Sequence, residues 1–86
     1  MDQDALAREL PKVEERRAPP VPVVAHLAVD DEEHVGLLYG WSRTATDDRA
    51  LRGLVVCRRE YAAGFFSDYV GWVLASRIRR EDGAGR

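Results

Sequence analysis

The segment from residue 61 to residue 78 constrains the fold more than any other part of the chain. It holds five of the seven aromatic residues, and no lysine or arginine lies between Arg59 and Arg77. At a helical period its apolar side chains spread over more than half of the circumference, whereas a surface helix normally shows a stripe only a little over about 100° wide. Three arginines follow, which suit the C-terminal end of a helix dipole. The pattern predicts a long, unusually apolar helix over residues 60–80.

Three shorter segments have the period of β-strands. Residues 21–29 alternate, with valine, alanine and leucine on one parity. Residues 34–44 are ambiguous, because Asp30 and Glu33 match a helix capping box while Gly36 and Gly40 weaken a helix. We expect a strand there, and a third strand over residues 54–57.

The first twenty residues predict a short helix over residues 3–10, a break at Pro11 and a stiff proline-rich arm over residues 18–22. With 86 residues the chain is long enough for one domain. We therefore expect an arm over residues 1–20, one globular domain over residues 21–82 and a frayed tail over residues 83–86. The expected fold is α+β: a short N-terminal helix, a three-stranded antiparallel meander and a long C-terminal helix. The alternative is all-α, with helices near residues 31–43 and 47–80.

Such a helix presents more apolar surface than one small sheet can cover, and exposed apolar patches mark interfaces. We therefore expect a protein partner, either a second copy or a larger subunit. The alternative is that the N-terminal arm covers the surface within one chain. A membrane span is not favoured, because Asp68 lies near the middle of the segment. The expected interface combines aromatic anchors with a ridge of small residues: Tyr61, Phe65, Ser67, Tyr69, Gly71, Trp72 and Ala75.

The net charge of −2 conceals an acidic first half and an arginine-rich second half. A basic face is one signature of nucleic-acid binding, although the pI of about 5.6 argues against it. A nucleic-acid-binding regulator is therefore the alternative function. Its contacts would be seven arginines: Arg49, Arg52, Arg58, Arg59, Arg77, Arg79 and Arg80.

The run Asp30, Asp31, Glu32 and Glu33 predicts a solvated acidic turn, or alternatively an acidic contact loop. His26, His34 and Cys57 have no metal-ligand spacing, so we predict no metal and no cofactor. Cys57 fits a small buried apolar residue better than a nucleophile. Asp68 either pairs with Arg52 or Arg58 or is simply solvated, and solvation is slightly favoured.

No motif in the sequence indicates a reaction, so we expect a non-enzyme. The expected function is a small protein–protein interaction module: an accessory subunit, an inhibitor or a self-associating adaptor, of bacterial or phage type. No basic start followed by an apolar stretch is visible, so we expect a cytoplasmic location.

Overall fold

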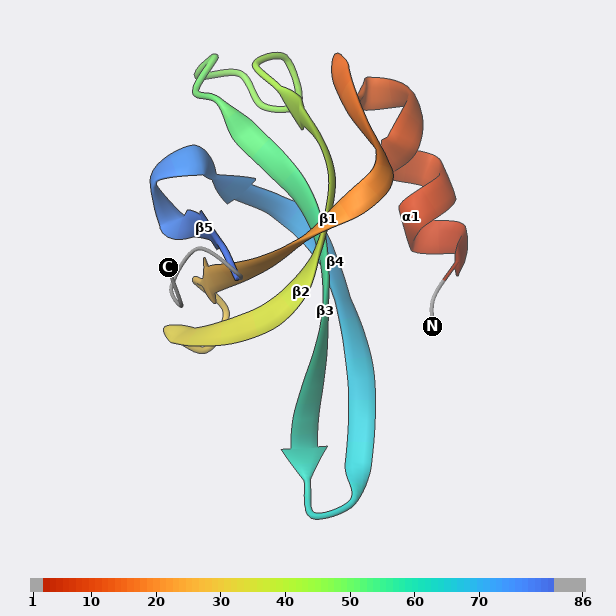
Figure 1. Ribbon diagram of the computed structural model, residues 1–86, viewed down its shortest axis with the longest axis vertical. Helices are drawn as coiled ribbons and strands as arrows, with labels where there is room; N and C mark the ends of the chain where they lie inside the picture. The colour runs from red at the N-terminus through yellow and green to blue at the C-terminus, as the bar shows by residue number, and fades with distance from the viewer. Residues whose placement is uncertain (1–2, 82–86) are drawn as a thin grey trace.

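The computed structural model describes residues 3–81, which form one strongly curved antiparallel sheet with a short helix at its N-terminal end (Figure 1). The sheet has five strands in the order β4-β3-β2-β1-β5. The elements are α1 (Gln3–Glu9), η1 (Leu10–Lys12), β1 (Glu15–Leu27), β2 (Glu32–Ser42), β3 (Arg52–Ala62), β4 (Phe65–Leu74), η2 (Ala75–Arg77) and β5 (Ile78–Arg80).

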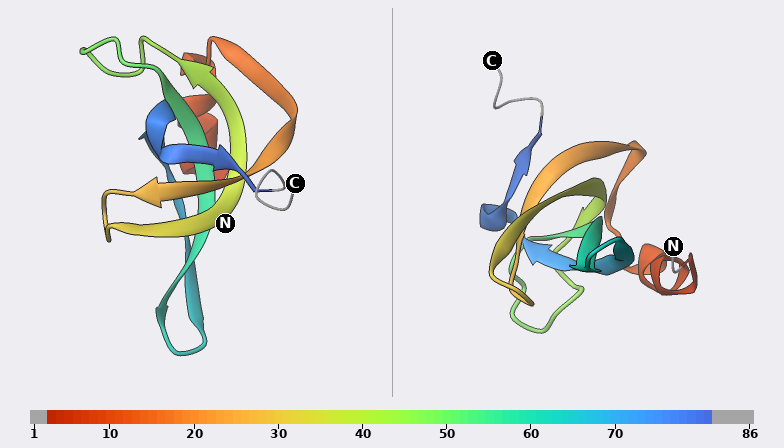
Figure 2. Two further views of the ribbon diagram at one scale, coloured as in Figure 1. Left: turned by 60° about the vertical axis from the view of Figure 1, so that its left-hand side comes forward. Right: turned by 90° about the horizontal axis from the view of Figure 1, so that it is seen from below.

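Consecutive hairpins join β1 to β4, and the last strand returns to the other edge of the sheet. The single 3-10 turn of η2 makes this return, and its first amide donates to the Leu51 carbonyl at 3.0 Å. β5 then pairs with β1, where Ile78 lies opposite Ala25. Figure 2 shows the sheet curling so that η2 and β5 lie across its open side.

The core lies on the concave face, where alternate residues of each strand point inward. Strand alternation places these side chains on one side of the sheet and their neighbours on the other. Leu38 of β2 and Ile78 of β5 both approach Gly53, whose lack of a side chain lets the curled sheet close around them. The core cluster consists of Val23, Ala25, Leu27, Leu38, Val55, Cys57 and Val73.

The convex face is covered only in part. Leu54 is fully buried there, and its partner across β3 and β4 is Trp72. The Trp72 Nε1 atom donates to Glu9 Oε1 at 2.8 Å, so α1 lies beside this part of the face. Further along β2, the side chain of Val35 is 56% exposed. The N-terminal segment therefore covers one end of the convex face and leaves the other open to solvent.

The predicted long C-terminal helix is wrong. Residues 61–80 instead hold the end of β3, the turn at Ala63 and Gly64, and the elements β4, η2 and β5. The wide apolar arc that suggested an unusual helix arises because both faces of β4 carry apolar side chains, which hides the alternation typical of a half-buried strand. Gly64 has φ +77°, a backbone conformation that L side chains rarely adopt, and it closes the turn. The all-α alternative is wrong for the same reason.

Other sequence expectations are confirmed or refined. The strands expected near residues 21–29, 34–44 and 54–57 correspond to β1, β2 and β3, and the short N-terminal helix is α1. The proline-rich residues 18–22 are part of β1 rather than a separate connector, at an irregularity in the pairing between Arg16 and Val21. Residues 83–86 lie outside the described part of the chain.

Gly36 is expected to be essential to the packing of β2 on β3. A Cβ atom at this position would lie 2.5 Å from the Val56 carbonyl oxygen and 2.6 Å from Cys57 Sγ. Because the first of these atoms is backbone, it cannot move aside cheaply. Gly36→Ala should therefore lower the free energy of unfolding by about 1–3 kcal/mol in urea titrations. The control Ser67→Ala, at an exposed β4 position, should change it by less than about 0.5 kcal/mol, and equal effects would contradict this packing.

Candidate interaction surface

The last part of the β3–β4 hairpin projects from the sheet as a two-stranded ribbon. β2 pairs with β3 only as far as Gly36 opposite Cys57, whereas β3 and β4 continue to pair until Ala62 opposite Phe65. Residues 58–67, which we call the ribbon, therefore have no third strand beside them (Figure 1). An isolated two-stranded hairpin is only marginally stable in water, so this extension gains little from its own burial.

The end of the ribbon is aromatic and exposed. Tyr61, Phe65 and Phe66, which we call the aromatic tip, are 64%, 61% and 54% exposed. Their contacts are local: the Tyr61 and Phe65 ring centroids lie 6.3 Å apart, and the Arg58 guanidinium lies 5.9 Å from the Phe66 centroid. Three large rings held in solvent on a projecting hairpin are unusual in a monomer, because such patches mark binding surfaces.

β4 is also an open edge of the sheet. Within residues 3–81 no other segment forms backbone hydrogen bonds to its outer side. Proteins normally protect such an edge with lysine, proline or a bulge. The ten residues of β4 contain no proline or lysine, and Asp68 is their only charged side chain. The expectation that Asp68 is solvated is wrong: it is 10% exposed, and its Oδ1 lies 3.6 Å from Arg58 Nε.

The structure divides the predicted interface residues into two groups. Tyr61, Phe65 and Ser67 lie exposed on the ribbon. Tyr69 instead packs against the core, and Trp72 is bonded to Glu9. The predicted ridge of Ser67, Gly71 and Ala75 does not form, because it required a helix and these residues lie in β4 and η2.

Phe66 belongs to the exposed surface and was missed by the sequence analysis. Its position on the ribbon follows only once the turn at Gly64 is known. The signal that could have located it is the Ala63–Gly64 pair, flanked on both sides by aromatic residues.

The acidic run spans the end of the β1–β2 turn and the start of β2, and three of its four carboxylates have a partner, although the Asp31 and Glu33 side chains remain 89% and 54% exposed. Asp30 accepts from His34 Nε2 at 2.7 Å and from Arg59 Nε at 3.1 Å. Burial raises the pKa of Asp30, but the hydrogen bonds from His34 and Arg59 outweigh it and the net pKa is lowered. The two other pairs are Asp31 with His26 at 2.6 Å and Glu33 with Arg79 at 2.8 Å. The charge of the run is therefore compensated only in part: Arg59 and Arg79 offset Asp30 and Glu33, while Asp31 remains 89% exposed.

The same turn contains one group with metal-ligand chemistry. The ligand atoms of Asp30, Glu32 and His34 lie within 4.8 Å of one another. However, the Arg59 guanidinium contacts the same Asp30 oxygen that His34 contacts. This places a positive charge where a cation would bind, so the group acts as an ion-paired clamp between the turn and β3.

Most arginines of the predicted nucleic-acid surface are paired with acids. Arg52 binds Asp48 through two guanidinium nitrogens, at 2.7 and 3.2 Å. Arg58 lies beside Asp68, Arg59 beside Asp30 and Arg79 beside Glu33. Four of the seven arginines thus have an acidic neighbour, so the set offers less unpaired positive charge for phosphate contacts than its number suggests. In the described chain, no helix is long and apolar enough to cross a membrane.

Cys57 is fully buried on the concave face. Desolvation, together with the charge of Asp30, raises the pKa of its thiol to about 11. The thiolate is the reactive form of cysteine, so burial and a raised pKa both suppress its reactivity. The interpretation of Cys57 as a buried apolar residue is confirmed.

Cys57 should react with iodoacetamide at pH 8 about a hundredfold more slowly in the folded protein than in concentrated urea. Mass spectrometry of quenched samples gives both rates. Equal rates in the folded and unfolded protein would contradict the burial of the thiol.

Asp48 should make the stability pH-dependent. Hydrogen bonds from Arg52, Thr46 and the Ala50 amide hold the pKa of this carboxyl well below its usual range. A carboxyl with a lowered pKa stabilises the fold above its unfolded pKa of about 4, and this contribution is lost as the pH falls toward the folded value. Asp48→Asn should therefore lower the urea midpoint at pH 7, and the difference from wild type should shrink as the pH falls below 4.

The neighbouring Asp47→Asn is the matched control, since Asp47 is exposed and makes no contact with Arg52. Its urea midpoint should follow that of the wild type throughout. A difference in urea midpoint between Asp48→Asn and wild type that stays constant with pH would contradict the role of the carboxylate.

Comparisons with known proteins do not assign a family or a function to this surface. The sequence matches no protein-family model, and neither the curated proteins nor the solved structures gave a match.

Proposed function

We propose that this chain is a non-enzymatic interaction module that associates with a second copy of itself through the ribbon and the outer edge of β4. The observation that carries the proposal is the exposed aromatic tip, held away from the core on a two-stranded extension. Burial of aromatic side chains dominates the energetics of protein interfaces, so these rings gain free energy only when something covers them.

A second copy is a suitable occupant because β4 offers an edge that is complementary to itself. Two antiparallel β4 strands related by a two-fold axis would pair their unpartnered backbone groups and join the two sheets into one. The two ribbons then run in opposite directions. Phe65 and Phe66 of one copy come to lie against the middle of β4 of the other, which also contains Val70. This arrangement removes apolar surface from water in both copies.

The charges near β4 permit this approach. Asp68 is the only charged residue of the strand, and Arg58 lies beside it on the neighbouring strand. Each copy therefore compensates its own acid, and the meeting of two strands brings no unpaired like charges together. By contrast, nucleic-acid binding is not favoured, because acids neutralise most of the arginines that it would need.

A cytoplasmic, non-catalytic role is part of the same proposal. The buried thiol of Cys57, with its raised pKa, is unsuited to nucleophilic attack. A larger protein partner would use the same tip, and it remains the alternative occupant that the experiment below distinguishes.

Sedimentation equilibrium of the purified protein tests the proposal. We expect a dimer at micromolar concentrations for the wild type. The triple variant Tyr61→Ser, Phe65→Ser, Phe66→Ser should dissociate at least about tenfold more readily, because it loses the aromatic burial. Ser67→Lys, which places a charge on the exposed edge strand, should also weaken the dimer. Circular dichroism must show that both variants remain folded.

Val29→Ser is the matched control, because Val29 is 59% exposed but belongs to the β1–β2 turn, not to the aromatic tip or to β4. Its dimer should be as tight as that of the wild type. A wild-type protein that remains monomeric over this concentration range would overturn self-association and leave a larger partner as the occupant of the tip.

A further inference from the structure

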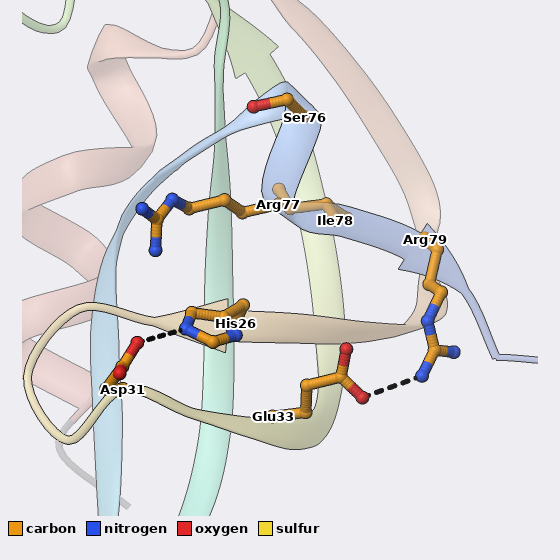
Figure 3. Close-up of a pocket in the computed structure, with 7 residues that line it drawn as sticks. All are labelled: His26, Asp31, Glu33, Ser76, Arg77, Ile78 and Arg79. Atoms are coloured by element: carbon orange, nitrogen blue, oxygen red, sulfur yellow. Dashed lines mark hydrogen bonds and ion pairs between the residues drawn. The ribbon is translucent and has the colours of Figure 1, made fainter.

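A cavity of about 440 Å³ lies at the opposite edge of the sheet from β4, where η2 and β5 meet the β1–β2 hairpin (Figure 3). It is lined by His26 and Asp31 from the hairpin, by Ser76 and Arg77 from η2, and by Arg79 from β5. This volume lies within the range of small-molecule sites.

The charges that line the cavity are not all compensated. Glu33 accepts from Arg79 Nη2 at 2.8 Å, and Asp31 lies 2.6 Å from His26 Nε2. Within residues 3–81, Arg77 has neither an ion pair nor a side-chain hydrogen bond. In Figure 3 its side chain extends away from Arg79, toward the end of the cavity where His26 and Asp31 lie. A guanidinium without a carboxylate partner, at the edge of a cavity, is suited to bind an added carboxylate or phosphate.

The backbone that carries Arg77 is fixed at both ends. Ala75 N donates to the Leu51 carbonyl at 3.0 Å, and Glu81 N donates to the Pro22 carbonyl at 3.2 Å. Between these points, Ile78 pairs with Ala25 of the core strand. The position of the guanidinium is therefore limited to the rotamers of one side chain, which reduces the entropy lost when a ligand binds.

A second cavity of about 220 Å³ shares His26 and Arg77 with the first. Its other lining residues include Tyr69, Trp72 and Leu74 of β4 and Arg52 of β3. His26 and Arg77 thus lie between a polar cavity and a more apolar one, in which the additional cation, Arg52, is bound to Asp48. A ligand that fills both must carry an anionic group joined to a flat apolar group.

We infer that His26 and Arg77 form a binding site for an aromatic organic anion, an aryl carboxylate or an aryl phosphate. The anionic oxygens lie against the Arg77 guanidinium and the Ser76 hydroxyl, and the ring enters the compartment lined by Tyr69 and Trp72. This site does not include the aromatic tip, but its second cavity is lined by Tyr69, Trp72 and Leu74 of β4, the strand that the proposed dimer uses.

Titration followed by NMR of the His26 ring resonances tests the inference with four probes: benzoate, phenyl phosphate, benzamide and inorganic phosphate. Saturable shifts with benzoate or phenyl phosphate are expected, and the tighter of the two identifies the preferred anion. Benzamide has the ring without the charge, and inorganic phosphate has the charge without the ring. Both should bind at least about tenfold more weakly.

Arg77→Gln should weaken binding of the better anion about tenfold or more, because a charged hydrogen bond is lost. The matched control is Arg16→Gln, at an exposed arginine of β1 that lies outside both cavities, and it should bind as the wild type does. Three results would overturn the inference: no saturable shift at millimolar anion, benzamide binding as tightly as benzoate, or unchanged affinity in Arg77→Gln.

Discussion

The fold depends on the closure of one curved sheet around a single small core. Alternate residues of β1, β2, β3 and β4 supply that core from the concave face, and glycines at the strand crossings let the backbones approach. A domain this small buries only about 60–65% of the surface of its unfolded chain, so little apolar area can be left in solvent without consequence. The remainder of the structure is arranged around this core, with the N-terminal helix covering one end of the convex face through the bond between Glu9 and Trp72.

The ribbon stands outside this arrangement. Its strands pair only with each other, and its aromatic tip adds nothing to the core. By contrast, the β1–β2 turn is tied down at several points: Asp30 to His34 and Arg59, and Glu33 to Arg79. The Asp30–Arg59 pair also ties the base of the ribbon to this turn, so the uncovered part of the β3–β4 hairpin is its outer end, with the aromatic tip, and the open edge of β4. This difference is why we propose the ribbon and the edge of β4, rather than the acidic turn or the arginines, as the surface that binds a partner.

The sequence was sufficient to place three strands and the N-terminal helix, because each has a clear period or boundary signal. It failed over residues 61–80, where both faces of β4 are apolar and the period of two is hidden. A strand with a core on one side and a covering helix on the other looks, by composition, like a very apolar helix. Tyr61 and Phe65 were identified as anchors from residue type alone. Asp30 and Arg59 lie 29 residues apart in the chain, and Glu33 and Arg79 lie 46 residues apart. Neither ion pair could therefore be predicted without knowledge of the fold.

The central claim is that the outer edge of β4 pairs with another β4 strand. Amide hydrogen exchange measured by NMR over a range of protein concentrations tests it residue by residue. The account predicts that alternate amides within residues 65–70 become more protected as the concentration rises, while those of β5 at the opposite edge do not change. Protection of residues 65–70 that is the same in dilute and concentrated samples would contradict it.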